Sequence, residues 1–256
     1  MRMKSIVMKE AHVLAAWYDL IHCPGLFRKD HLYAHYFGEM SKFLYFKYLI
    51  ESKGLWTPLI RCICLRVGCR NPLVQRILEV VRSVEVYGWS KFSEYVGRIL
   101  APKVKRLFND VFPVFKDFMA RVFNIDVGNI KELYVIYGFN PGSGLYGSLL
   151  HYHRDYIIVS NFVNEYVSPK LALDLIYHEL LHAILRLHSL DLPDEVEEEL
   201  IDSLTPEGYL SIYLGLTDKL NIGKGKISEV VSEYFKDKLF SKGIPIQYYI
   251  KRKLKR

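Results

Sequence analysis

Residues 168–202 have the sequence SPKLALDLIYHELLHAILRLHSLDLPDEVEEELID, which contains the stretch His178-Glu179-Leu180-Leu181-His182. Ser168 followed by Pro169 is typical of a helix start, so we predict a helix that runs from there to about His188. Leucine, isoleucine and alanine surround the histidines on nearly all sides, which predicts a helix that is buried on most of its faces. This helix and the segment after it organise the expected fold.

Two histidines four residues apart lie about 40° apart around a helix and one turn along it. Both imidazoles of His178 and His182 can therefore reach one tetrahedral zinc ion. Glu179 lies beside them, where a carboxylate can take a proton from water and pass it to a leaving amine. Because buried histidines need polar partners, the apolar surroundings favour a metal. The sequence thus predicts a zinc site.

A third ligand is expected from the next helix, which we predict to start at Pro193. Glu198 and Asp202 are four residues apart and face the same way, so Glu198 can bind zinc while Asp202 orients a histidine. A helix hairpin would bring Glu198 level with His182, since His182 lies about 9 Å before the turn and Glu198 about 7.5 Å after it. Glu195 with Glu199 is a rival pair with the same spacing.

His188 is an alternative third ligand. Its spacing from His182 is metzincin-like, but Leu185 stands where that pattern has a glycine for a sharp turn. A three-histidine site would suit another zinc-dependent hydrolase, including an RNA-processing nuclease. A non-catalytic binding module on a peptidase fold is a further alternative, and it gives Glu179 no role.

The motif His178-Glu179-x-x-His182 followed by Glu198-x-x-x-Asp202 resembles the gluzincin metallopeptidases, and residues 102–240 resemble the compact archaeal minigluzincins. This resemblance implies a zincin-like fold, hydrolysis of a peptide or protein by a zinc-activated water, and frequent latency. It also implies that substrate pairs with an edge strand, for which the candidates are residues 145–151 and 156–160. A tyrosine or histidine usually stabilises the oxyanion, and the candidates are Tyr209, Tyr213 and His151.

The expected fold class is α+β, with three parts. Residues 1–100 are predicted to be a mainly helical, basic region with a pro-segment or regulatory role, residues 101–243 the zincin-like domain, and residues 244–256 a basic tail. Further predicted elements are helices at 72–83, 102–123 (kinked at Pro113), 205 onward and 228–239, and strands at 133–137, 145–153 and 156–159.

Charge is unevenly distributed along the chain, whose net charge is +7. Residues 1–125 hold 20 basic and 10 acidic side chains, whereas residues 126–250 hold 10 basic and 18 acidic ones. The basic half could bind nucleic acid, although no nucleic-acid motif is recognisable, or could dock on the acidic half and keep the enzyme latent.

The four cysteines are too few for a disulfide scaffold, so we expect small buried side chains, with a disulfide only in a thermophilic source. Having just two glutamines favours such a source. Cys23 is a weak candidate for a thiolate that caps the zinc. No apolar run of transmembrane length and no signal peptide is apparent, which predicts a cytoplasmic protein.

Overall fold

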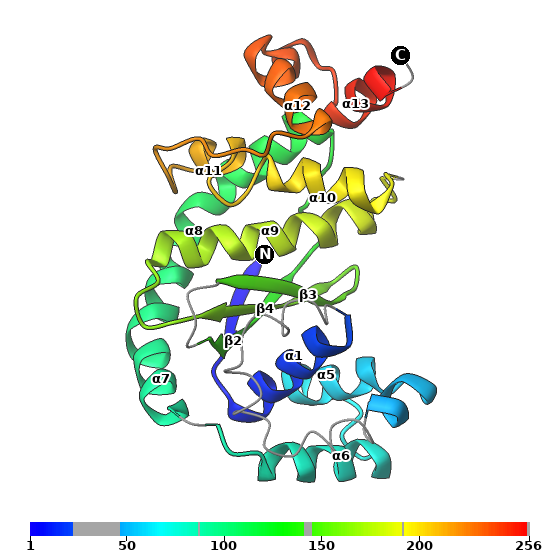
Figure 1. Cartoon of the computed structure of the whole chain (residues 1–256), viewed down its shortest axis with the longest axis vertical. Helices are drawn as coiled ribbons and strands as arrows, with labels where there is room; N and C mark the ends of the chain where they lie inside the picture. The colour runs from blue at the N-terminus through cyan, green and yellow to red at the C-terminus, as the bar shows by residue number, and fades with distance from the viewer. Residues whose placement is uncertain (23–46, 87, 141–144, 191, 255–256) are drawn as a thin grey trace.

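The computed structural model describes residues 1–22, 47–86, 88–140, 145–190 and 192–254, with side chains omitted for residues 19–22. A four-stranded sheet in the order β1-β2-β4-β3 lies between two layers of helices (Figure 1). The α+β class is therefore confirmed. The strands are β1 (Arg2–Ile6), β2 (Glu132–Phe139), β3 (Tyr146–Tyr152) and β4 (Tyr156–Val163).

Strand pairing decides which strand is at the edge. β1, β2 and β4 are parallel, and β3 folds back as a hairpin antiparallel to β4. The three predicted strands are confirmed, whereas β1 was not predicted. Residues 156–160 lie in β4, which has partners on both sides, so the expectation that they form an edge is wrong. β3, which holds most of residues 145–151, occupies the edge.

Both faces of the sheet are covered, because side chains alternate between them along each strand. Helices α8 (Ala101–Phe118) and α9 (Pro169–Leu187) cover one face, and α1 (Lys9–His22), α5 (Trp56–Leu65) and α6 (Pro72–Ser83) cover the other. Leu149 packs into the α8–α9 core and its neighbour Leu150 into the α1 core. We call these two sides the α9 face and the α1 face.

The expected boundary at residue 100 lies inside one helical run. This run comprises α7 (Trp89–Tyr95), the π-helix η1 (Val96–Leu100), α8 with Pro113 inside it, and the π-helix η2 (Met119–Phe123). β1 pairs with β2 along its whole length. The first hundred residues thus contribute a strand to the central sheet as well as helices. Asn71 caps α6, because its side-chain oxygen accepts hydrogen bonds from the backbone N–H groups of Leu73 and Val74.

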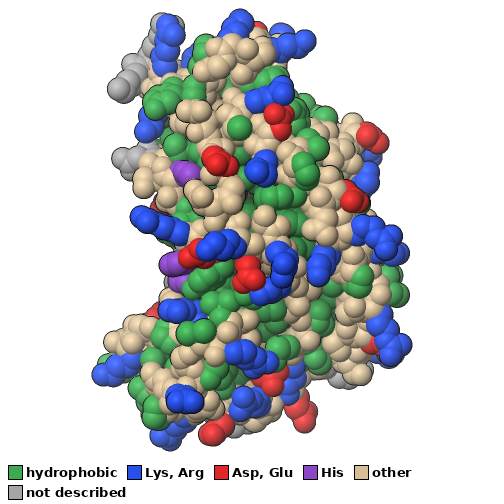
Figure 2. Space-filling view, turned by 180° about the vertical axis from the view of Figure 1, so that it is seen from behind, with side chains coloured by type: hydrophobic (Ala, Val, Ile, Leu, Met, Phe, Trp, Pro, Cys, Tyr) green, Lys and Arg blue, Asp and Glu red, His purple; other side chains and the backbone are tan. Residues whose placement is uncertain are grey.

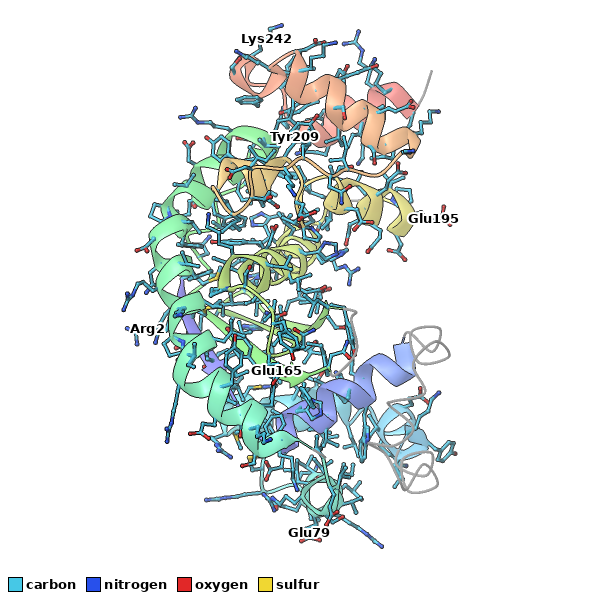
Figure 3. The ribbon with its side chains drawn as sticks, turned by 60° about the vertical axis from the view of Figure 1, so that its left-hand side comes forward. Arg2, Glu79, Glu165, Glu195, Tyr209 and Lys242 are labelled. Atoms are coloured by element: carbon cyan, nitrogen blue, oxygen red, sulfur yellow. A yellow bond between two sulfur atoms is a disulfide. The ribbon has the colours of Figure 1, made fainter. Side chains whose placement is uncertain are left out.

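The C-terminal part is helical and lies beyond α9 (Figure 3). It comprises α10 (Asp194–Asp202), α11 (Tyr209–Tyr213), α12 (Lys226–Lys236), the 3-10 helix η3 (Leu239–Lys242) and α13 (Ile246–Leu254). The helix expected from Thr205 begins at Tyr209 instead. The expected basic tail is not free, because Ile246 and Ile250 are fully buried and Gln247 donates a hydrogen bond to the Phe123 carbonyl.

The helix expected at 228–239 is α12, which begins at Lys226 and has no capping side chain of its own at its N-terminus. The Glu199 carboxylate instead accepts hydrogen bonds from the backbone N–H groups of Ile227 (3.0 Å) and Ser228 (3.1 Å). A carboxylate suits this position, since the first N–H groups of a helix have no partner within it. The cap therefore comes from α10, distant in sequence.

Cys62 and Cys69 form a disulfide between α5 and the segment before α6, and Cys64 is free. Burial raises the pKa of the Cys64 thiol to about 12, so this side chain behaves as a small apolar group. Cys23 lies outside the described residues. No helix among those described is long and apolar enough to cross a membrane. On the face in Figure 2, basic side chains extend from one end to the other with acidic ones between them.

Candidate metal centre

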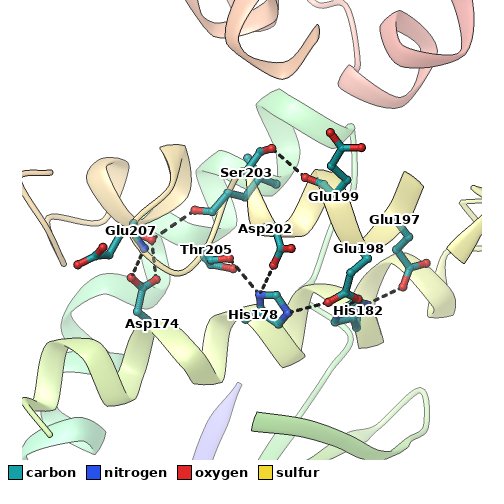
Figure 4. Close-up of polar contacts among 12 residues, drawn as sticks. Asp174, His178, His182, Glu197, Glu198, Glu199, Asp202, Ser203, Thr205 and Glu207 are labelled. Carbon is teal, nitrogen blue, oxygen red and sulfur yellow. Dashed lines mark hydrogen bonds and ion pairs between the residues drawn. The ribbon is translucent and has the colours of Figure 1, made fainter. Parts of the chain in front are cut away.

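Three potential metal ligands converge between α9 and α10. His178 and His182 come from α9 and Glu198 from α10, and one ligand atom from each lies within 4.8 Å of the others. Nε2 of His182 is 3.2 Å and Nε2 of His178 is 3.8 Å from the Glu198 carboxylate (Figure 4). The α9–α10 hairpin thus brings together the three residues that the sequence predicted.

The other nitrogen of His182 is held by a glutamate that the sequence analysis did not identify. Nδ1 lies 2.7 Å from Oε1 of Glu197, which also accepts a hydrogen bond from Arg186 at 3.2 Å. Glu197 is almost completely buried. A carboxylate at Nδ1 keeps the proton on that atom and leaves the Nε2 lone pair for a cation.

His178 is held by a backbone carbonyl. Its Nδ1 lies 3.0 Å from the carbonyl oxygen of Thr205, while Asp202 is 4.0 Å away. Asp202 was predicted to orient a histidine, and it does lie beside His178, but Thr205 provides the shorter contact. The chain turns back after α10 and brings this carbonyl within hydrogen-bond distance of Nδ1. A carbonyl carries no side-chain signal, so the sequence could not identify it.

The loop that carries Thr205 is itself anchored to α9. Asp174, one turn before His178, accepts hydrogen bonds from the Glu207 backbone N–H (2.9 Å) and the Ser211 hydroxyl (2.6 Å). Asp174 is buried, and burial raises its pKa while these two bonds lower it. Since α9 supplies both His178 and the anchor of its carbonyl partner, the ring is fixed relative to its own helix.

Glu179 points toward the sheet edge. A Cβ added to Gly147 of β3 would lie 2.7 Å from Cγ of Glu179, so glycine allows this close approach. The carboxylate accepts a hydrogen bond from the Leu149 backbone N–H, and burial raises its pKa. A buried glutamate with a raised pKa is suited to exchange a proton beside the candidate ligands His178, His182 and Glu198, which we call the metal group.

The charges in the cluster are strongly coupled. Burial lowers the pKa of His182, but hydrogen bonds to Glu197 and Glu198 outweigh that effect and raise it to about 9. Hydrogen bonds from both His178 and His182 hold the pKa of Glu198 well below its usual range. A cation that binds here would therefore replace protons on the imidazoles.

The alternative ligands lie elsewhere. His188 is exposed at the C-terminal end of α9 and does not join the metal group, because without a glycine at 185 the helix continues to Leu187. Glu195 is exposed and points outward from α10 (Figure 3), and Glu199 caps α12. Glu195 and Glu199 therefore do not form the alternative pair of ligands.

The three candidates for oxyanion stabilisation have other contacts. The Tyr213 hydroxyl donates to Asp117 (2.8 Å), and the Tyr209 ring stacks on Phe235 with centroids 4.3 Å apart. His151 follows a bulge at Leu150, which turns its side chain to the α1 face, where Nε2 lies 3.4 Å from the Tyr156 hydroxyl. Strict alternation would have placed His151 on the α9 face, the same face as Gly147 and Leu149.

Two imidazoles and a carboxylate, with both Nε2 atoms directed at one carboxylate, form a donor set that fits zinc. Among the described residues, only these three form such a converging group. Comparisons of the chain with known protein families, curated proteins and solved structures find no match. An assignment of function therefore rests on the site alone.

Proposed function

We propose that this protein is a zinc-dependent metallopeptidase whose metal is held by His178, His182 and Glu198. The observation that carries the proposal is the convergence of their ligand atoms within 4.8 Å, beside the buried Glu179. This arrangement of residues agrees with the gluzincin-like motif.

Each residue has a defined task in this proposal. Zinc would supply Lewis acidity toward water and a peptide carbonyl. Glu179 would remove a proton from the attacking water and deliver it to the amine nitrogen as the peptide bond breaks, and its burial beside both histidines supports this role. Glu197 and the Thr205 carbonyl hold the imidazoles in one tautomer.

An extended substrate would align with β3. This strand lies at the sheet edge and contacts α9, and Glu179 bonds to the Leu149 N–H within it. An exposed strand edge offers N–H and C=O groups to a peptide main chain, which gives affinity with little dependence on sequence.

Zinc content tests the ligand set. We expect about one zinc per chain in the wild type, loss of zinc in Glu198→Ala, and retention in His188→Ala. Zinc lost with His188→Ala but kept with Glu198→Ala would contradict the proposal.

Cleavage of a mixed peptide library, with and without Glu179→Gln, tests the activity. Zinc binding without cleavage under any condition, including after limited proteolysis to relieve latency, would leave a zinc-binding module.

A further inference from the structure

A pocket of about 330 Å³ lies among α8–η2, α11 and α12–η3, and none of its lining residues belongs to the metal group. Pockets of this size are typical of small-molecule sites. Tyr209 marks its position in Figure 3. Its apolar walls include Phe118, Val122, Tyr209, Ile212, Phe235 and Phe240.

The pocket walls are held by aromatic packing. Phe235 stacks on Tyr209 at 4.3 Å and on Phe118 at 6.1 Å between ring centroids. Ile212 is 40% exposed at the opening. Stacked rings from three separate elements keep the pocket open, so an apolar ligand would displace water without first having to separate side chains.

Cationic side chains border this apolar surface. Arg121 pairs with Asp117 at 2.9 Å, so its charge is already matched. Lys236 and Lys238 also line the pocket, and neither makes an ion pair with any residue that the structure describes. Asp237, between them in sequence, is not in the lining. Two exposed lysines without an ion-pair partner among the described residues thus border an apolar interior.

We propose that this pocket binds an amphiphilic anion, a medium-chain alkyl carboxylate whose chain fills the aromatic interior and whose carboxylate lies at Lys236 and Lys238. Apolar walls reward each methylene, and the two lysines select the charge of the head group. The site is independent of the proposed zinc chemistry, because no residue is shared between them.

Calorimetric titration of the full-length protein with hexanoate, octanoate and decanoate tests the proposal. Affinity should rise about fourfold per methylene until the pocket is full, since each methylene contributes about 0.8 kcal/mol. 1-Octanol and octylammonium should bind several-fold more weakly than octanoate. Zinc-loaded and zinc-stripped protein should bind octanoate equally, whereas binding only in the zinc-loaded form would place the carboxylate on the metal and overturn the proposal.

Two variants locate the site. Ile212→Trp should fill the opening and abolish octanoate binding, and its circular dichroism spectrum should match the wild type. Lys236→Gln combined with Lys238→Gln should weaken octanoate about fivefold and leave 1-octanol unchanged, with Lys242→Gln as the matched control outside the lining.

Octanoate binding that survives Ile212→Trp would overturn the proposal. So would a failure of every alkyl carboxylate to bind, or binding only of a peptide with an apolar side chain beside a glutamate, which would indicate a protein partner instead.

Discussion

Two buried histidines on opposite faces of the sheet have pKa values that are shifted in opposite directions. His12 of α1, on the α1 face, accepts a hydrogen bond from the Phe139 backbone N–H and stacks on Trp89. Burial alone lowers its pKa to about 3. His182, on the α9 side, is also buried, but hydrogen bonds to Glu197 and Glu198 raise its pKa to about 9.

Burial by itself therefore does not make a histidine functional. An imidazole surrounded by aromatic rings stays neutral and contributes to packing, whereas one between carboxylates can exchange a proton for a cation. We therefore expect changes on the α1 face to alter stability, and changes in the metal group to alter zinc binding and catalysis.

Glu179→Gln should have the largest effect. Peptide hydrolysis should fall about 10³-fold or more, because the amide keeps the shape but cannot accept the proton. Zinc content should stay unchanged. Stability at neutral pH should hold or rise, since burial disfavours the ionised carboxylate. Hydrolysis assays and urea unfolding on the same preparation check this, and undiminished cleavage would remove Glu179 from the mechanism.

The pH dependence of stability should identify His12. Its pKa is lowered in the folded state, so the unfolded chain binds a proton below about pH 6.5 that the folded chain refuses until about pH 3. Protonation of this residue in the unfolded chain should lower the free energy of unfolding by about 3 kcal/mol between pH 7 and pH 4.5. His12→Asn keeps an acceptor for Phe139 and should lose that part of the dependence in urea titrations. An unchanged pH profile would contradict the assignment.

Removing the Cys62–Cys69 disulfide should have a smaller effect, a loss of stability that is confined to the α1 face. Cys62 and Cys69 close a short loop, seven residues apart, so Cys69→Ala should lower the free energy of unfolding by about 2 kcal/mol. Cys64→Ala is the matched control. Zinc affinity should be the same in the wild type, Cys69→Ala and Cys64→Ala. A loss of zinc in Cys69→Ala would show that the two faces of the sheet are not independent.

Glu197→Gln should have the smallest effect of the four. It removes the charge behind His182 while an amide oxygen can still accept from Nδ1, so zinc affinity should fall about tenfold. Glu195→Gln, exposed on the same helix, should change nothing. Competition with a chromogenic chelator measures both, and equal affinities would mean that Glu197 only packs.

What the sequence predicted depended on local periodicity. The α9 helix, the positions of His178 and His182, and the level of Glu198 on the next helix all follow from 3.6 residues per turn. The strands at β2, β3 and β4 followed from alternation.

Long-range contacts were not predictable in this way. Thr205 holds His178 through its backbone carbonyl, which has no side-chain signal. Asp174 binds the backbone of Glu207, 33 residues further along the chain. The side chain of His151 lies on the α1 face because of a bulge in β3. β1 was missed because five residues carry too little pattern, and its partner β2 lies more than 120 residues away in sequence.

The acidic residues of α10 look equivalent in the sequence, yet three consecutive glutamates contact three different neighbours. Glu197 holds His182, Glu198 joins the metal group and Glu199 caps α12. Neighbouring positions on a helix are about 100° apart, so deleting one residue before Glu197 would turn all three carboxylates away from their neighbours together. Over evolutionary time, this segment should tolerate changes in its exposed charges but no change in its length.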